Sequence, residues 1–276
     1  MNTSIYPCIW FNHNAGEAAT FYCKLFSHSR IIRTTPMVVT FELEGVKFMG
    51  LNGRDQFRPT PALSYFVYCE NDHTKIERLY EQLKEGGNVL MPLGKYDWSE
   101  KYAWVEDKFG VSWQLDIEQI NHPQKIVPAF LFVNEKRNDV KKAVDLYTSV
   151  FENSTVLLSF PETGIPTFVQ LKLNNYLFNL MSGGDMHHAF DFTEGNSIVI
   201  ECDTQGQIDH YWHELTKDGT ESMCGWLSDP FGSSWQIIPA ILGQLMSDPE
   251  KAQKVMAAVL KMKKLDIVQL QQAAIS

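Results

Sequence analysis

The chain has 276 residues, is 44% hydrophobic and 21% charged, and carries a formal net charge of −9. This length suffices to bury ordinary cores in two domains of roughly 120 residues each, and the acidic balance excludes an extended phosphate-binding surface, so no nucleic-acid partner is expected. No apolar run approaches the roughly 20 residues that cross a bilayer, and residues 1–6 lack the basic start and apolar stretch of a signal peptide. We therefore expect a cytoplasmic protein with no membrane partner.

Periodicity predicts the same order of elements in each half of the chain. Helical spacing of apolar residues marks the helices, and short alternating runs mark the strands. The glycine of Glu44-Gly45 supplies the positive φ that a tight hairpin needs, and Asp107 and Gly110 suit the ends of a type I turn. The expected elements are, in chain order, strand 5–11, helix 16–26, strands 37–43 and 46–51, strand 64–70, helix 73–85, and two strands that meet at the turn 107–110.

A twelve-residue segment occurs twice, at 104–115 and at 226–237, with seven identical columns that include two tryptophans. Its shared pattern is Trp-x-x-Asp-x-Phe-Gly-x-Ser-Trp-Gln. Further matches follow in the same order along the chain. For example, the pattern Pro-x-x-x-Phe at 7–11 recurs at 128–132. The chain is therefore a duplicated module, and a functional account has to explain two similar half-sites.

The repeats set the expected domain boundaries. We predict a first module at residues 1–121, a second at 125–243 and a helical extension at 244–276, with a polar linker around Pro123. The copies differ by small insertions, which surface loops tolerate. The largest insertion lies in the first copy at 92–102, and its aromatic residues could form a lid over one of the two sites: Tyr96, Trp98 and Tyr102.

The five cysteines are odd in number and never spaced as Cys-x-x-Cys. This pattern argues against a disulfide framework and against a zinc knuckle. We interpret the cysteines as buried thiols on strands and a helix. They are Cys8, Cys23, Cys69, Cys202 and Cys224.

These motifs resemble the vicinal oxygen chelate superfamily, the glyoxalase, bleomycin-resistance and extradiol-dioxygenase group, and within it the PhnB-like subgroup labelled as a 3-demethylubiquinone-9 3-methyltransferase domain. The resemblance spans nearly the whole chain and implies an α+β fold of two tandem βαβββ-type modules that form paired cupped sheets, with a C-terminal helical tail. It is carried by Cys8-Ile-Trp-Phe-Asn12, the Ala18-x-x-Phe-Tyr-x-x-x-Phe26 helix, Phe41-Glu-Leu43, Phe48-Met-x-Leu-Asn-Gly53, both Trp-x-x-Asp endings, and the tail 255–267.

The resemblance also implies where a metal would bind. Metal-dependent relatives use His, Gln or Glu on the first strand, a His or Glu on later strands and a final Glu after the turn glycine. In this chain those positions fall on residues that are poor ligands for zinc, nickel or iron, which favour anionic or nitrogen donors. They are Pro7 and Pro128, Ser64 and Ser197, and Gln114 and Gln236. We therefore expect no metal and no other cofactor.

Strand alternation assigns the remaining candidate residues. Gln114 and Trp113 point to opposite faces of one strand. The resemblance implies that Gln114 faces the cupped interior, so we expect Trp113 in the core, with the same split between Gln236 and Trp235. A register slip of one would move Trp104 and Trp226 between core and pocket. The candidate ligand-binding residues are Gln114, Ser64, Asn52 and Trp104 in the first copy and Gln236, Ser197 and Trp226 in the second.

These observations favour a metal-free protein that binds a small molecule and that could sequester a planar or hydrophobic compound. The alternative is an enzyme of the same superfamily, of lyase, isomerase or dioxygenase type, which uses either a metal site of another kind or acid and base groups such as Glu42, Glu106 or Asp116. A third class is a structural protein that acts through protein contacts. No Gly-x-Gly-x-x-Gly opens a helix, so the methyltransferase label is not supported by a nucleotide-binding motif. We expect the two modules to pair within one chain, and two such chains could form a further homodimer.

Overall fold

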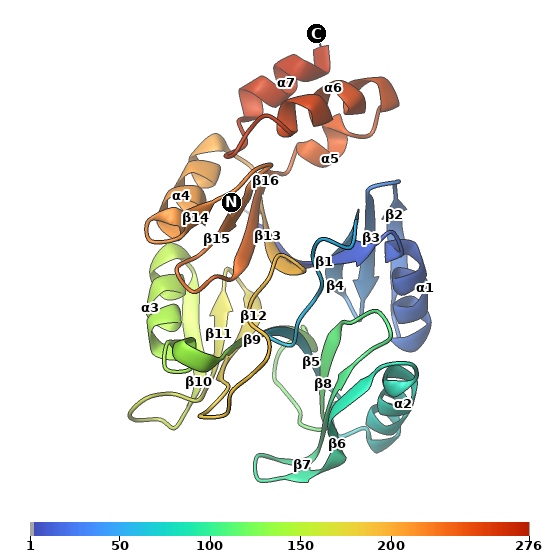
Figure 1. Cartoon of the computed structure of the whole chain (residues 1–276), viewed down its shortest axis with the longest axis vertical. Coiled ribbons are helices and arrows are strands. Elements are labelled where there is room, and N and C mark those ends of the chain that lie inside the picture. Colours follow the sequence, from blue (N-terminus) through green and yellow to red (C-terminus); the bar gives the residue numbers. More distant parts are fainter. Residues whose placement is uncertain (1–2, 276) are drawn as a thin grey trace. The chain divides into compact units, whose positions relative to one another are not determined.

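The computed structural model describes residues 3–275, and its fold is α+β, with two eight-stranded mixed sheets and helices against them (Figure 1). The first copy contains β1 (Ser4–Asn12), α1 (Ala15–Leu25), β2 (Arg30–Thr34), β3 (Val38–Leu43), β4 (Val46–Gly53), β5 (Leu63–Tyr68), α2 (His73–Lys84), β6 (Asn88–Tyr96), β7 (Ser99–Glu106) and β8 (Ser112–Asp116). The second contains β9 (Ile126–Phe132), a 3₁₀ turn (Asn134–Lys136), α3 (Val140–Val150), β10 (Ser154–Phe160), β11 (Phe168–Leu173), β12 (Tyr176–Ser182), β13 (Asn196–Cys202), α4 (Gln205–Thr216), β14 (Thr220–Glu221), β15 (Trp226–Ser228) and β16 (Ser234–Pro239).

Each sheet takes strands from both copies. One sheet has the order β14-β15-β16-β13-β1-β4-β3-β2, and the other has the order β10-β11-β12-β9-β5-β8-β7-β6. In the second sheet β5 of the first copy pairs antiparallel with β9 of the second, from Leu63 opposite Phe130 to Val67 opposite Ile126. The chain divides into two compact units, residues 7–196 and residues 1–6 with 197–276, so the second sheet lies wholly in the larger unit.

Local sequence signals explain where two helices begin and where one tight hairpin forms. The Asp72 side chain accepts a hydrogen bond from the Lys75 amide at 2.9 Å and so caps α2. Thr204 and Gln207 form a capping box at the start of α4. Glu44 and Gly45 both have positive φ, as the tight hairpin between β3 and β4 requires.

The repeated Asp of the twelve-residue segment organises the core of each copy. Asp107 accepts hydrogen bonds from the Phe109 and Val111 amides, from the Tyr22 hydroxyl at 2.7 Å and from the Trp113 indole at 2.9 Å. Burial raises the pKa of Asp107, and these four donors oppose that rise. The residue therefore does more than form the predicted turn, since it joins that turn to α1 and to β8.

Asp229 repeats this arrangement in the second copy. It accepts from the Phe231 and Ser233 amides at 2.9 and 3.0 Å and from the Trp235 indole at 2.9 Å. Trp113 and Trp235 are both fully buried, as the alternation predicted. Most of the repeated segment thus serves the structure of the core.

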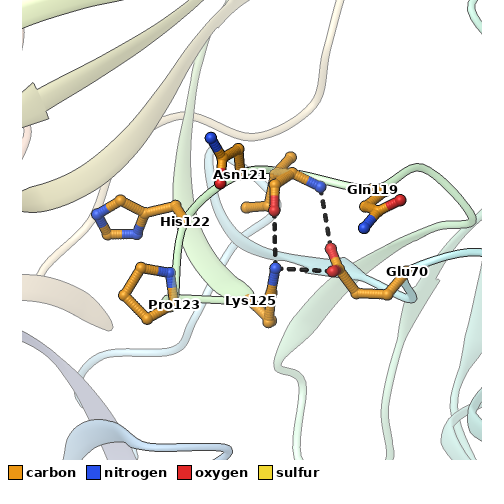
Figure 2. A pocket seen from close by; sticks show the side chains of 7 residues that line it. Glu70, Gln119, Asn121, His122, Pro123 and Lys125 are labelled. Carbon is orange, nitrogen blue, oxygen red and sulfur yellow. Dashed lines mark hydrogen bonds and ion pairs between the residues drawn. The ribbon is translucent and has the colours of Figure 1, made fainter.

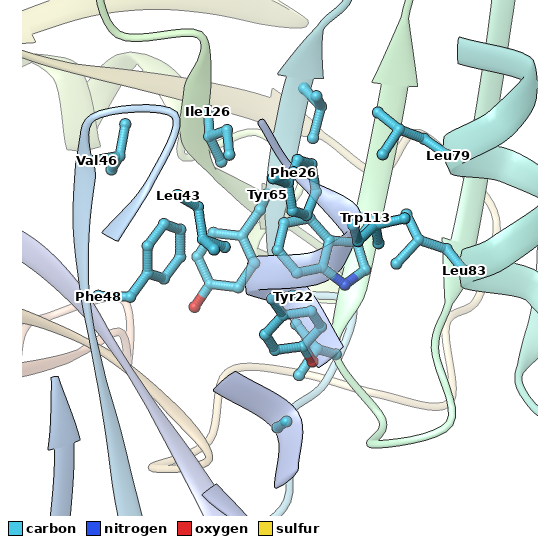
Figure 3. Close-up of a cluster of buried hydrophobic side chains, with 14 of the residues drawn as sticks. Tyr22, Phe26, Leu43, Val46, Phe48, Tyr65, Leu79, Leu83, Trp113 and Ile126 are labelled. Atoms are coloured by element: carbon cyan, nitrogen blue, oxygen red, sulfur yellow. The ribbon is translucent and has the colours of Figure 1, made fainter. Parts of the chain in front are cut away.

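The helix-side core of the larger unit is rich in rings. Trp113 lies 5.2 Å from Tyr22, 5.2 Å from Phe26 and 5.3 Å from Tyr65, measured between ring centroids. Figure 3 shows these residues beside the aliphatic side chains Leu79 and Leu83 of α2. Edge-to-face and tilted contacts of this kind fix both the ring orientations and the position of the helices on the sheet.

The C-terminal tail is helical, as expected, with α5 (Leu242–Leu245), α6 (Pro249–Val259) and α7 (Ile267–Ile275). Its own small core contains Val255, Val259 and Leu270. Two backbone hydrogen bonds of 2.7 Å, from the amides of Cys224 and Gly225 to the carbonyls of residues 262 and 263, attach it to the second copy. Over residues 3–275, no helix has both the length and the apolar character that a membrane span requires.

Two strands of the first copy were absent from the sequence prediction. β2 is an edge strand whose residues are all exposed, so it has no alternating pattern to detect. β6 contains Pro92 and Gly94 and pairs with β7 through several register shifts. The insertion at 92–102 therefore extends a hairpin, and it is not a separate loop.

Candidate functional site

One face of the second sheet carries a side-chain cluster distinct from the helix-side core, and we call this side the cup face. Its floor is made by small residues such as Ala129 and Val127, with rings around them. Phe66 lies 5.2 Å from Tyr68 and 5.9 Å from Tyr102 between ring centroids. Because all of these residues belong to residues 7–196, the whole face can be described within one compact unit.

A buried chain of hydrogen bonds crosses the cup face through Gln114. The Tyr102 hydroxyl donates to Gln114 Oε1, and Gln114 Nε2 donates to Ser64 Oγ at 2.7 Å. All three side chains are nearly or fully buried. Gln114 and Ser64 therefore lie together on the predicted face, but both ends of the amide are engaged by the protein, so Gln114 acts through its neighbours more than as a free orienting group.

Trp104 lies on the cup face. It is the cross-strand partner of Gln114, is half-buried and packs on the cup cluster. Its indole nitrogen donates to Ser112 Oγ at 2.7 Å. The register thus resolves the ambiguity left by the sequence, because Trp104 and Trp113 occupy opposite faces of the sheet.

A second polar group on the cup face was missed by sequence reasoning. The Tyr68 hydroxyl accepts from Asn179 Nδ2 at 3.0 Å and from Gln170 Nε2 at 3.1 Å. Gln170 Nε2 also donates to Asn179 Oδ1 at 3.1 Å. These residues are 102 and 111 positions from Tyr68, so no local pattern could have joined them.

The three carboxylates considered as acid or base groups have different surroundings. Asp116 is buried at the end of β8, where burial raises its pKa and the Ser99 hydroxyl donates to it at 2.7 Å. Glu106 accepts from Asn88 at 2.9 Å, and Glu42 pairs with Arg30 across β2 and β3 at 3.5 Å. Asp116 alone of these three combines a buried carboxyl with a place beside Tyr102 and Tyr68.

Asn52 does not lie beside Gln114, contrary to the expectation from sequence. Its Oδ1 accepts from the Ala15 amide at 2.9 Å, and its Nδ2 donates to the Pro36 carbonyl at 3.1 Å. Asn52 therefore fixes the start of α1. In β4, Asn52 is the cross-strand partner of Phe11, which belongs to the helix-side core.

The second copy repeats part of this arrangement within its own unit. Gln236 Nε2 donates to Ser197 Oγ at 2.9 Å, and Trp226 lies opposite Gln236. The remaining polar groups differ. Ile238 occupies the position of Asp116, and Glu201, which accepts from the Tyr6 hydroxyl at 2.7 Å, occupies the position of Tyr68.

The cup face is open to solvent along β10. Leu158 is the cross-strand partner of Gln170 and is 53% exposed, and Phe160 is the partner of Phe168 and is 65% exposed. Phe168 in turn lies 6.3 Å from Phe66. Exposed apolar side chains beside a buried polar group are typical of a ligand-binding surface.

A pocket of about 590 Å³ lies at the linker between the copies. Figure 2 shows its frame, in which Lys125 pairs with Glu70 at 2.8 Å and donates to the Ile120 carbonyl at 2.7 Å, while the Ile120 amide donates to Glu70 at 2.9 Å. Burial, with the charges of Lys172 and Lys125, lowers the pKa of His122 in its wall. Ile120 also packs on the cup cluster, so this pocket adjoins the cup face.

The positions that would hold a metal in this fold do not fit one. Ser64 and Gln114 are neutral and already hydrogen-bonded to each other, as are Ser197 and Gln236. Among residues 3–275 no group of three His, Cys, Asp or Glu side chains is placed to hold an ion. The first-strand position also needs correction, because Pro128 pairs with the core residue Tyr65, while its neighbours Val127 and Ala129 carry the cup face.

We expect purified protein to carry no stoichiometric transition metal, because these amide and hydroxyl donors are weak ligands. The measurement is elemental analysis together with native mass spectrometry of protein purified without chelators. One zinc, nickel, manganese or iron per chain, lost on Gln114→Leu or Gln236→Leu, would contradict this expectation. The matched control is Gln82→Leu on the exposed surface of α2, which should leave the metal content unchanged.

Comparisons with known proteins agree with the duplicated fold. A family model described as 3-demethylubiquinone-9 3-methyltransferase matches twice, at residues 3–116 and 124–238. Glyoxalase I from Zea mays is 10% identical, with a TM-score of 0.55 over 94% of this chain and 98% of that one. A Bacillus subtilis protein with a provisional dioxygenase assignment is 12% identical, with a TM-score of 0.52 over 97% of this chain and 94% of that one.

A Bacillus cereus PhnB protein, itself provisionally assigned as a 3-demethylubiquinone-9 3-methyltransferase, is 36% identical over 40% of this chain and 96% of its own, with a TM-score of 0.38. No curated protein matches the chain. The family match thus covers both copies, and the glyoxalase and dioxygenase neighbours share the fold.

Proposed function

Because this chain belongs to the 3-demethylubiquinone-9 3-methyltransferase family, with the fold of glyoxalase I and dioxygenase-type proteins, we propose that it binds a small, flat and largely apolar molecule on the cup face without a metal. Proteins with this fold have many activities, so the side chains of the cup face indicate the function more closely than the fold does. The family description names a methyl transfer, but no nucleotide-binding glycine motif accompanies it.

One observation carries the proposal: the cup face combines buried, fully organised polar groups with an exposed apolar rim. The Tyr68 hydroxyl is held by the amides of Asn179 and Gln170 and therefore offers a fixed polar atom. Leu158 and Phe160 leave apolar surface in contact with water. A flat ligand that covers this surface would gain the free energy of burying it, while the polar groups fix its orientation.

The rim provides the test, because its residues are exposed and can be changed without disturbing the core. The probe is 2-acetylnaphthalene, a small, flat and largely apolar molecule. Leu158→Ser should weaken its binding roughly threefold to tenfold, which corresponds to the loss of part of one buried side chain. Thermal unfolding should be nearly unchanged, since surface substitutions usually cost little. The measurement is isothermal titration calorimetry of wild-type and variant proteins.

The matched control is Ile32→Ser, which alters a residue of similar exposure, 49%, on the edge strand β2 of the other sheet. This variant should bind the probe as the wild-type protein does. Equal loss in both variants, or no binding to the wild-type protein, would sink the proposal.

A second candidate function, proton transfer on the bound molecule, is favoured by Asp116. Burial raises the pKa of its carboxyl, and the Ser99 hydroxyl orients it beside Tyr102. A buried carboxyl with a raised pKa beside a ligand surface is a candidate general acid or base. If a screen finds turnover, Asp116→Asn should abolish it and leave ligand affinity within about threefold of the wild-type value; retained turnover would exclude this role.

We also propose that the protein works in the cytoplasm. All five cysteines are free, and thiols stay reduced in that compartment. Burial raises the pKa of Cys69 and of Cys202 to about 12, so these two are inert thiols and not nucleophiles.

A further inference from the structure

The hydroxyl of Tyr68 is an unusual donor within the cup face. A phenol has one proton to donate and two lone pairs that accept. Both lone pairs are used, by Asn179 Nδ2 and by Gln170 Nε2, and the second hydrogen of the Gln170 amide goes to Asn179 Oδ1. Among the residues that the structure describes, none accepts the proton of Tyr68.

The Tyr68 hydroxyl is buried, so water cannot easily reach it to accept this proton. Tyr68 is only 5% exposed, and Asn179 is fully buried. Buried donors are almost always paired in folded proteins, because an unpaired donor loses its hydrogen bond to water. Two amides that hold the oxygen as an acceptor leave the O–H directed elsewhere, which is the arrangement of a donor prepared for an incoming acceptor.

The surroundings define the chemical class of that acceptor. Phe66 lies 5.2 Å from the Tyr68 ring and 6.3 Å from Phe168, so the Tyr68 side chain lies among aromatic rings that suit contact with a flat apolar ligand. Burial raises the pKa of Tyr68, and the carboxylate of Asp116 raises it further against the effect of the two amides. The phenol therefore keeps its proton at neutral pH, and the same carboxylate disfavours a negative charge on the ligand.

We propose that Tyr68 donates its hydrogen bond to a neutral carbonyl oxygen, as in a ketone or aldehyde, on a flat apolar ligand. This inference rests on the proposed function of the cup face and adds the recognition chemistry of its ligand. Asn179 and Gln170 are positioning residues in this scheme, because they fix the phenol oxygen and leave its proton for the ligand.

The second copy does not offer the same donor. Glu201 takes the place of Tyr68, and its carboxylate accepts from Tyr6. A carboxylate is an acceptor when ionised. Recognition of a carbonyl is therefore a property of the first copy, and the two half-sites differ in the polarity of the group at this position.

The test uses two probes that differ only in the acceptor, 2-acetylnaphthalene and 2-isopropenylnaphthalene, in which C=CH₂ replaces C=O. Wild-type protein should bind the ketone about fivefold to tenfold more tightly than the alkene, as expected for one neutral hydrogen bond. In Tyr68→Phe the two affinities should become equal. The matched control is Tyr65→Phe, on the same strand but the opposite face, where the hydroxyl donates to Asn196 at 3.2 Å; it should keep the preference for the ketone.

A spectroscopic measurement keeps the test valid if Tyr68→Phe folds poorly. The infrared carbonyl stretch of ¹³C-labelled 2-acetylnaphthalene bound to wild-type protein should lie below its value in cyclohexane, because a hydrogen bond weakens the C=O bond. Equal binding of both probes, an unshifted carbonyl stretch, or tighter binding of 2-naphthoate than of the ketone would overturn the inference and leave the cup-face site intact. Absence of binding by every probe would overturn the proposed function itself.

Discussion

Trp113→Ala and Trp235→Ala should each destabilise the protein by roughly 3–5 kcal/mol, because each removes a fully buried indole and leaves a cavity. Each variant also removes a donor to a buried aspartate, Asp107 or Asp229, at 2.9 Å. The exposed Trp98 provides the control, since it is 58% exposed at the tip of the hairpin between β6 and β7. Trp98→Ala should cost less than about 1 kcal/mol.

The measurement is unfolding in guanidinium chloride, followed by far-UV circular dichroism. Because the two tryptophans lie in different compact units, each variant is expected to shift the transition of its own unit if the units unfold separately. A cost for Trp113→Ala no larger than that for Trp98→Ala would show that the aromatic cluster of Figure 3 does not support the fold.

The core of each copy could be predicted from the sequence because its signals are local. Trp113 and Gln114 are neighbours on one strand, so alternation alone assigns them to opposite faces. The apolar spacing of 16–26 marks a helix, and α1 begins one residue earlier and ends one residue earlier than predicted. Helix ends are uncertain by about this amount because terminal turns fray.

The site could be predicted only in part, because its polar groups come from distant strands. Gln114 and Ser64 were joined through the resemblance to a known family, but Tyr68 and Asn179 meet through the β5–β9–β12 order of the sheet. Asn52 was misplaced because its amide could serve a ligand or cap a helix, and only the register of β4 decides between these roles.

Duplication has preserved the core more strictly than the site. Asp107 and Asp229 each accept hydrogen bonds from two turn amides and from one indole. Beyond the shared Gln–Ser pair and facing tryptophan, the first copy carries Tyr68 and Asp116, whereas the second carries Glu201 and Ile238 at the same positions. Two half-sites with different polar groups are suited to two different ligands, or to one functional site and one structural relic of the repeat.

Separate production of residues 1–121 and 125–243 should yield poorly soluble or dimeric proteins, because neither sequence repeat contains a complete set of strand partners. In the larger unit β5 of the first copy forms five cross-strand pairs with β9 of the second. The cup cluster is shared in the same way, since Phe66 and Tyr102 come from one copy and Val127 and Leu177 from the other. Exposure of this apolar face and of an unpaired central strand favours aggregation.

Co-expression of the two halves supplies the control, because each then finds its missing partner. We expect a one-to-one complex that unfolds cooperatively and binds 2-acetylnaphthalene, whereas each half alone should show neither property. The measurements are size-exclusion chromatography with light scattering and thermal unfolding. Independent, monodisperse monomers of both halves would contradict the expectation that the modules pair within one chain. The five cross-strand pairs and the shared cluster would then be dispensable for folding, although each backbone hydrogen bond contributes about 0.5–1.5 kcal/mol.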